Sequence, residues 1–87
     1  MANVHLPATL PPLFTGLPRR LEIDAPTVGA AIAELEARWP GLRDRLIEPG
    51  PSIRSNIHVY VDKKRAGLDT AISDASRVDV IAAISGG

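Results

Sequence analysis

The stretch Arg77-Val-Asp-Val-Ile-Ala-Ala-Ile-Ser-Gly-Gly87 decides how the rest of this chain is interpreted. Its side chains alternate between two sets with a period of two, which is the pattern of a β-strand with one buried face. Val78 and Val80 belong to the expected inner face, whereas Asp79 and Ile81 belong to the expected outer face. The stretch therefore predicts a strand that lies in a sheet with one solvated side.

The residues after this strand have little to pack. Ser85, Gly86 and Gly87 carry small or absent side chains, and glycine adopts many backbone conformations. We therefore expect residues 1–84 to form the folded domain and residues 85–87 to form a flexible tail. Our working hypothesis is that the reactive group of the protein is the main-chain carboxylate of Gly87.

Length and charge limit the class of protein. A chain of 87 residues builds one small core. Its ten basic and ten acidic residues cancel, and neither sign forms a long run, which argues against nucleic-acid or membrane-surface binding. We interpret Lys63-Lys64-Arg65 as a solvated turn.

The chain has no cysteine, so neither a disulfide framework nor a cysteine-based zinc site is available. Without a thiol, the chain is also unable to carry sulfur as a side-chain persulfide. The first residues lack the basic start and apolar core of a signal peptide, and the apolar run 80–84 is far shorter than the roughly 20 residues of a membrane-spanning helix. We therefore expect a cytoplasmic protein.

The remaining pattern predicts further strands and one main helix. Residues 3–6, 19–24 and 55–61 alternate between apolar and polar side chains, so we expect three strands, the first two forming a hairpin. Prolines place residues 7–18 in a loop. Residues 42–47 suggest one or two further helical turns, residues 63–67 a turn, and residues 68–72 either a helical turn or a packed loop.

The main helix is expected to begin after Thr27, whose hydroxyl can cap the first turn, and to stop at Pro40-Gly41. Apolar residues at helical spacing form one stripe, which would cover one face of the sheet. The fold class is therefore α+β. The predicted core consists of Val4, Leu6, Leu21, Ile23, Val28, Ile32, Leu35, Trp39, Ile57, Val59, Val61, Val78 and Val80.

This order of elements, together with the terminal Gly-Gly, resembles the ThiS/MoaD family of ubiquitin-like sulfur carriers, including the molybdopterin synthase small subunit and CysO-like carriers. The likeness covers nearly the whole chain. Pro26-Thr-Val-Gly29 is similar to the family's helix start, Asn56-Ile-His-Val-Tyr-Val61 to an inner strand, and Gly67-Leu-Asp-Thr70 to a later turn. The resemblance implies a β-grasp fold, with a mixed sheet of four to five strands packed on one main helix.

The resemblance also implies a chemistry. A partner adenylyltransferase of the ThiF/MoeB type, which resembles ubiquitin-activating enzymes, would use ATP to adenylate the Gly87 carboxylate. A sulfur donor such as a rhodanese or a cysteine desulfurase would then convert it to a thiocarboxylate. The acceptor enzyme would be the large subunit of molybdopterin synthase or an enzyme of the cysteine synthase type. The chain would be a protein co-substrate or a non-catalytic small subunit, with no permanently bound cofactor.

Two groups of residues are expected to bind partners. Ile84, Ser85 and Gly86 are expected to enter a narrow partner channel with the terminus. The two glycines let the channel walls approach the backbone, because they have no Cβ. Ile81 is expected to be exposed beside the tail.

The outer face around Ile81 is the second expected site. His58, Tyr60 and also His5 are candidates to share this face, where a few anchors would carry most of the binding energy. The alternative is an isolated exposed apolar residue without a function. His5 and His58 alone make a poor zinc site, so no metal is expected.

Three functions remain open from the sequence. The first is a sulfur carrier in cofactor or metabolite biosynthesis, such as molybdopterin or cysteine formation. The second is a ubiquitin-like modifier that is conjugated through Gly87 to lysines of target proteins. The third is a non-catalytic β-grasp interaction module.

Overall fold

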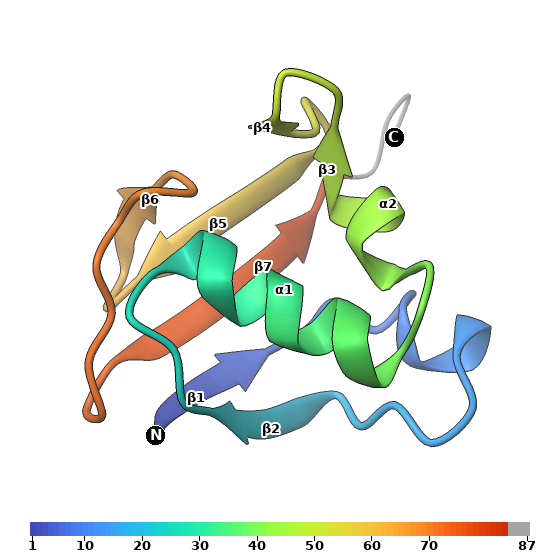
Figure 1. Cartoon of the computed structure of the whole chain (residues 1–87), viewed down its shortest axis with the longest axis horizontal. Coiled ribbons are helices and arrows are strands. Elements are labelled where there is room, and N and C mark those ends of the chain that lie inside the picture. Colours follow the sequence, from blue (N-terminus) through green and yellow to red (C-terminus); the bar gives the residue numbers. More distant parts are fainter. Residues whose placement is uncertain (84–87) are drawn as a thin grey trace.

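A five-stranded mixed sheet with one long helix across a single face forms most of the structure (Figure 1). It is a computed structural model and describes residues 1–83. The strands of the sheet follow the order β2-β1-β7-β5-β6. The strands are β1 (Ala2–His5), β2 (Arg20–Ile23), β3 (Ile47–Glu48), β4 (Ser52–Ile53), β5 (Ile57–Val61), β6 (Lys64–Ala66) and β7 (Arg77–Ala82); the helices are η1 (Pro11–Leu13), α1 (Val28–Arg38) and α2 (Leu42–Leu46).

The last strand lies at the centre of the sheet. β7 pairs in parallel with β1 and antiparallel with β5, while β1 and β2 form the expected antiparallel hairpin. The parallel pair joins segments from the two ends of the sequence, which a local pattern does not specify. The mixed sheet with α1 across it is the predicted β-grasp arrangement, so the expected fold class is confirmed.

The start of α1 is held by its cap and by a distant loop. Thr27 Oγ1 accepts a hydrogen bond from the amide of Ala30 at 3.1 Å, as expected for an N-cap. The amides of Val28 and Gly29 donate to the carbonyl groups of Thr70 and Leu68. A Cβ atom at Gly29 would lie 3.1 Å from the Leu68 carbonyl oxygen, so this close approach favours glycine. Residues 68–72 are therefore a packed loop.

The end of α1 differs from the prediction for Trp39. Trp39 is the C-cap of the helix and is partly buried, although it was predicted as a core residue. Its indole Nε1 donates to the carbonyl oxygen of Thr15 at 3.1 Å, and an aromatic ring with a polar N–H often keeps one edge near solvent for this reason. The Glu36 carboxylate accepts from the amides of Gly41 and Arg43, which ties α1 to α2.

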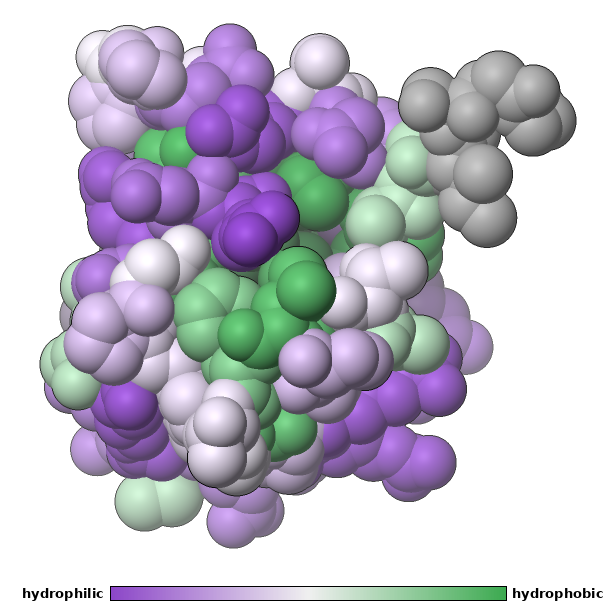
Figure 2. All heavy atoms as spheres, turned by 90° about the vertical axis from the view of Figure 1, so that its right-hand side faces the viewer, coloured by the Kyte–Doolittle hydropathy of each residue, from purple (hydrophilic) through white to green (hydrophobic). Residues whose placement is uncertain are grey.

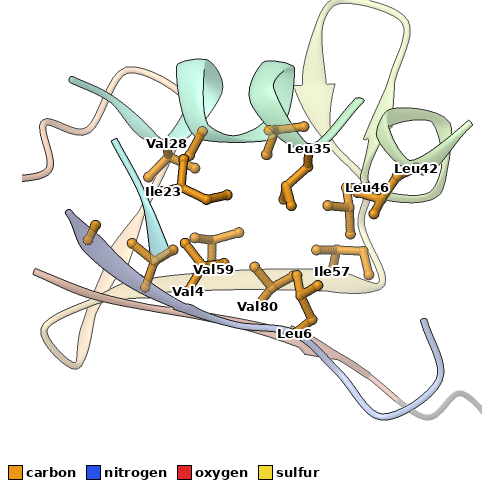
Figure 3. Close-up of a cluster of buried hydrophobic side chains, with 14 of the residues drawn as sticks. Val4, Leu6, Ile23, Val28, Leu35, Leu42, Leu46, Ile57, Val59 and Val80 are labelled. Carbon is orange, nitrogen blue, oxygen red and sulfur yellow. The ribbon is translucent and has the colours of Figure 1, made fainter. Parts of the chain in front are cut away.

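The core lies between the sheet and the two helices (Figure 3). Of the predicted set, Leu21 and Trp39 are partly buried and pack against the core, while all others are buried. The loops, α2, the short strands and two alanines of β1 and α1 add residues that the predicted core did not include. These additional buried apolar residues are Ala2, Leu10, Leu17, Ala31, Leu42, Leu46, Ile47, Ala66 and Ile72.

Two short strand regions were missed. The prediction of a turn over residues 63–67 was wrong, because Lys64–Ala66 is strand β6 and pairs with β5. The turn is confined to Asp62 and Lys63, both with positive φ angles (50° and 70°), as in the tight turns of two-residue hairpins. Ile47, expected in a helical turn, instead begins β3, which pairs with β4 in a separate two-stranded sheet.

The boundary predicted at residue 84 and the tail predicted for residues 85–87 lie outside the described residues. The described chain ends just beyond β7, where the amide of Ala83 donates to the carbonyl oxygen of Asn56 at 2.7 Å. This bond attaches the end of β7 to the residue before β5. Within residues 1–83, no helix is long and apolar enough to span a bilayer.

Candidate functional site

The face of the sheet opposite α1 carries the predicted docking residues. Alternation along β5 buries Ile57, Val59 and Val61 and leaves His58 and Tyr60 on the other face. In the antiparallel register between β5 and β7, His58 lies opposite Ile81 and Tyr60 lies opposite Asp79. Cross-strand neighbours of this kind have side chains in reach of one another.

His5 joins this face from the other side of β7. It is opposite Asp79 in the parallel pair of β1 and β7, so its strand is separated from that of His58 by β7. The two histidines therefore share a face without being strand neighbours. Within the described part of the chain, no group of three or more His, Cys, Asp or Glu side chains is placed to hold a metal ion.

Ile81 is the apolar centre of the face. It exposes 48 % of its surface, as predicted, although β7 is the central strand of the sheet. A shallow hollow at this position is lined by Tyr60, Lys63, Arg77, Asp79 and Ile81. Pairing of β7 with β5 fixes the backbone at Ile81, and a β-branched side chain is stiff at χ1, so contact with a partner would restrict little additional motion.

Charged groups surround Ile81. Arg77 Nε lies 3.1 Å from both carboxylate oxygens of Asp79, so this pair is largely self-compensated. The guanidinium of Arg65 lies 6.0 Å from the ring centroid of Tyr60, at the distance of a cation–π contact. Lys63 and Arg65 are exposed. The face therefore combines an apolar centre with a cationic border along β6.

His58 has one unusual feature. Its Nδ1 atom is buried and has no hydrogen-bond partner among residues 1–83, although the residue as a whole is only partly buried. Buried polar atoms in folded proteins nearly always have a partner. The local fold therefore leaves one polar atom of the face uncompensated beside Ile81.

The predicted reactive residue lies outside the described residues. The same holds for the channel residues, so the roles of Ile84, Ser85, Gly86 and Gly87 stay predictions. The docking role of Ile81, His58 and Tyr60 also stays a prediction, although their common face is confirmed.

Sequence reasoning missed a second exposed apolar residue near the same end of the molecule. Leu13 exposes 52 % of its surface. It follows two consecutive prolines in η1. An apolar residue directly after a proline pair was the available signal, because a loop fixed by prolines can hold a side chain outside the core.

A family model described as the ThiS family matches residues 13–87 of this chain. The chain belongs to the ThiS family. The match spans most of the described structure and extends through the terminal Gly-Gly. Membership is shown by the sequence as a whole, and the β-grasp sheet and helix described above agree with it.

Two curated relatives and one solved structure illustrate the similarity. The sulfur carrier protein CysO of Mycobacterium tuberculosis is 32% identical over 91 residues, covering 98% of this chain and 97% of its own. The small archaeal modifier protein 3 of Haloferax volcanii is 35% identical over 72 residues, which cover 78% of this chain and 76% of that protein. A chain of the Amycolatopsis orientalis BexX/CysO complex superposes with a TM-score of 0.88 at 26% identity, with both chains fully covered (100%).

Proposed function

We propose that this ThiS-family chain is a sulfur carrier in biosynthesis whose Gly87 carboxylate is converted to a thiocarboxylate. The observation that carries the proposal is the similarity to the sulfur carrier CysO over nearly the full length of both proteins. The terminal Gly86-Gly87 supplies a main-chain carboxylate without a neighbouring side chain. The chain itself acts as a co-substrate, and the partner enzymes supply the catalytic groups.

The carboxylate requires activation, because it is ionised at neutral pH and is a poor electrophile. One carboxylate oxygen attacks the α-phosphorus of ATP in the adenylyltransferase, and pyrophosphate leaves. The terminal sulfur of a partner's cysteine persulfide then attacks the acyl carbon and displaces AMP. A thiol cleaves the resulting acyl disulfide, which releases the thiocarboxylate and leaves a disulfide on the partner. The chain has no cysteine, so both sulfur-bearing groups come from partners.

The folded domain serves as the handle by which the partners hold the tail. The activating enzyme, of the ThiF/MoeB type, docks on the outer sheet face around Ile81, with His58 and Tyr60 beside it. This assignment is supported by the exposure of Ile81 and by its register opposite His58. A few well-placed apolar anchors account for most of the binding energy in typical interfaces.

The pathway that receives the sulfur is proposed from the relatives. Similarity to CysO favours a metabolite pathway with an acceptor of the cysteine synthase type over the large subunit of molybdopterin synthase. A rhodanese or cysteine desulfurase would provide the persulfide. The protein is proposed to work in the cytoplasm, where ATP and these enzymes are available.

Intact-mass spectrometry tests the proposal. The chain is incubated with ATP, the adenylyltransferase of its own genome and a sulfide source; exchange of one oxygen for sulfur adds about 16 Da. A variant without Gly87 serves as the matched control and should show no gain. An unchanged mass of the complete chain under conditions that activate a known ThiS-family carrier would refute the proposal.

A second function is favoured by one relative. The similarity to the small archaeal modifier protein 3 supports conjugation of Gly87 to lysine side chains of target proteins. The same reaction mixture, supplemented with soluble cell extract, distinguishes the two functions. Trypsin cleaves last after Arg77, so target lysines that carry residues 78–87 through an isopeptide bond would support the modifier. A thiocarboxylate without such peptides would support the carrier and refute the modifier.

A further inference from the structure

A second hollow lies beside the root of the tail, on the side away from Ile81. It is lined by residues of the loop before and within η1, of α2, and of the segment that leads into β5. A further hollow, on the sheet side, is lined by residues of β1, of the start of β2 and of β7, including Ile81. This hollow and the one beside η1 share Pro7 and Ala82. Ala82, the last residue of β7, therefore forms a ridge between these two hollows, and the described chain ends at the next residue, Ala83.

Leu13 is held in place at the edge of this second hollow. The amide of Leu10 donates to the carbonyl of Pro7, and the amide of Leu13 donates to the carbonyl of Leu10. Leu10 is buried and anchors the loop, whereas Leu13 is exposed. Pro11 and Pro12 fix their own φ angles between these two leucines. The loop therefore holds an apolar side chain in solvent at little entropic cost to a binding partner.

The border of the hollow is cationic. Arg45 on α2 is exposed, and Arg54 is positioned by a hydrogen bond of 2.8 Å from its Nε to the carbonyl oxygen of Asp44. Asp44 is the single carboxylate among the described lining residues, against these two guanidinium groups. Figure 2, which faces this end of the molecule, shows an apolar area bordered above by strongly hydrophilic residues.

We propose that this hollow is a second contact surface for the adenylyltransferase, so that the enzyme holds the tail root from both sides. The inference rests on the proposed function and adds the chemistry of the partner. The mouth of the enzyme's tail channel presents an apolar side chain to Leu13 and carboxylates to Arg45 and Arg54. Carboxylate groups complement guanidinium groups in geometry and in charge.

The length of the remaining chain supports contact on both sides. Gly87 lies four residues beyond Ala83 in the sequence, and four extended residues span about 13 Å at most. An enzyme that binds Gly87 in its active site must therefore bring its surface close to the ridge. Both hollows border that ridge, and a channel mouth that surrounds the tail meets the two of them.

ATP–pyrophosphate exchange by the adenylyltransferase tests the inference. Leu13→Glu should raise the KM for the carrier about tenfold with kcat unchanged, because it changes docking and leaves the reacting carboxylate intact. Ala33→Glu introduces the same charge at an exposed position of α1 that lines neither hollow. This control should stay within about twofold of the unsubstituted chain.

The arginine contribution is tested within a single helix. Arg45→Glu should raise the KM more than Arg43→Glu, because both reverse an exposed charge on α2 while only Arg45 lines the hollow. The difference should shrink between about 50 and 500 mM salt, since exposed charges are screened. If Arg45→Glu and Arg43→Glu raise the KM equally, the charges act only by long-range electrostatic steering, and the assigned contact of Arg45 is overturned.

The outcomes separate this inference from the proposed function. If the unsubstituted chain supports exchange and Leu13→Glu has an unchanged KM, the second surface is refuted while the carrier function stands. If the unsubstituted chain supports no exchange, the proposed function and this inference are both removed. Circular dichroism of each variant confirms that the fold is retained.

Discussion

Replacement of Ile81 tests most directly whether the outer sheet face is a docking surface. Ile81 exposes 48 % of its surface, which is roughly 85 Å² of mostly apolar area. Complete burial of that area by a partner would contribute about 2 kcal/mol at about 25 cal/mol per Å². This free energy corresponds to about a 30-fold change in affinity. Ile81 is thus expected to be one of the main anchors of the interface.

Two substitutions of Ile81 should lower the affinity for the adenylyltransferase to different extents. Ile81→Ala keeps the first carbon of the side chain, so we expect about a tenfold loss of affinity for the adenylyltransferase. Ile81→Glu also places a carboxylate in the interface next to Asp79, so we expect a loss of about 30-fold or more. Because the side chain is half exposed, the free energy of unfolding should change by no more than about 1 kcal/mol in either variant.

Isothermal titration calorimetry against the adenylyltransferase measures the affinities. Glu22→Ala is the matched control, because Glu22 is exposed on the same sheet and lines neither hollow at the tail root. Affinities of Ile81→Ala and Ile81→Glu within twofold of the original, with folding intact, would refute the docking assignment. Ile81 would then be an isolated exposed apolar residue, as many proteins have.

Three further predictions concern stability and the terminus. Leu35→Ala, at a side chain that is 1% exposed, should lower the free energy of unfolding in urea by about 2–5 kcal/mol, and a loss below about 1 kcal/mol would contradict the assigned packing. Glu36 has a pKa lowered from 4.5, chiefly because its carboxylate accepts hydrogen bonds from the amides of Gly41 and Arg43. The stabilisation is therefore present above the unfolded pKa and is lost as the pH falls through the folded pKa. Thermal unfolding followed downward from pH 5 should show a smaller decline for Glu36→Gln than for the unsubstituted chain, and identical profiles would refute the coupling. A tag fused after Gly87 should prevent the mass increase of about 16 Da that exchange of oxygen for sulfur gives, because it removes the free carboxylate. If the tagged chain still gains this mass, the reactive group lies elsewhere.

Local patterns in the sequence predicted the main elements because their physical signals are short in range. Thr27 as a cap, the apolar stripe of α1 and the alternation of β5 each depend on residues within a few positions of one another. The exposure of Ile81 followed from the same alternation, since Arg77 and Asp79 mark the outer face of β7. These predictions were confirmed because one buried face determines the register of a strand.

Patterns failed where a short segment takes its structure from a distant partner. β6 is three residues long and begins with two charged residues, a pattern that predicts a solvated turn. Pairing with β5 nevertheless makes it a strand. β3 and β4 have two residues each and stabilise one another. Trp39 fits the apolar stripe by spacing but lies at the C-cap, where its indole reaches Thr15 in another loop. Segments this short contain too few residues to express a period.

The sequence by itself determined the α+β class and the faces of the main strands, and it led to the hypothesis that Gly87 carries the chemistry. Only the tertiary structure decided which surfaces meet at the root of the tail. Pairing of β7 between β1 and β5 brings Ile81 beside His58, and the loop containing Leu13 to the other side of Ala82. The physical reason is that hydrogen bonding between strands and burial of a shared core act between residues that are far apart in the chain, and no local pattern encodes their position.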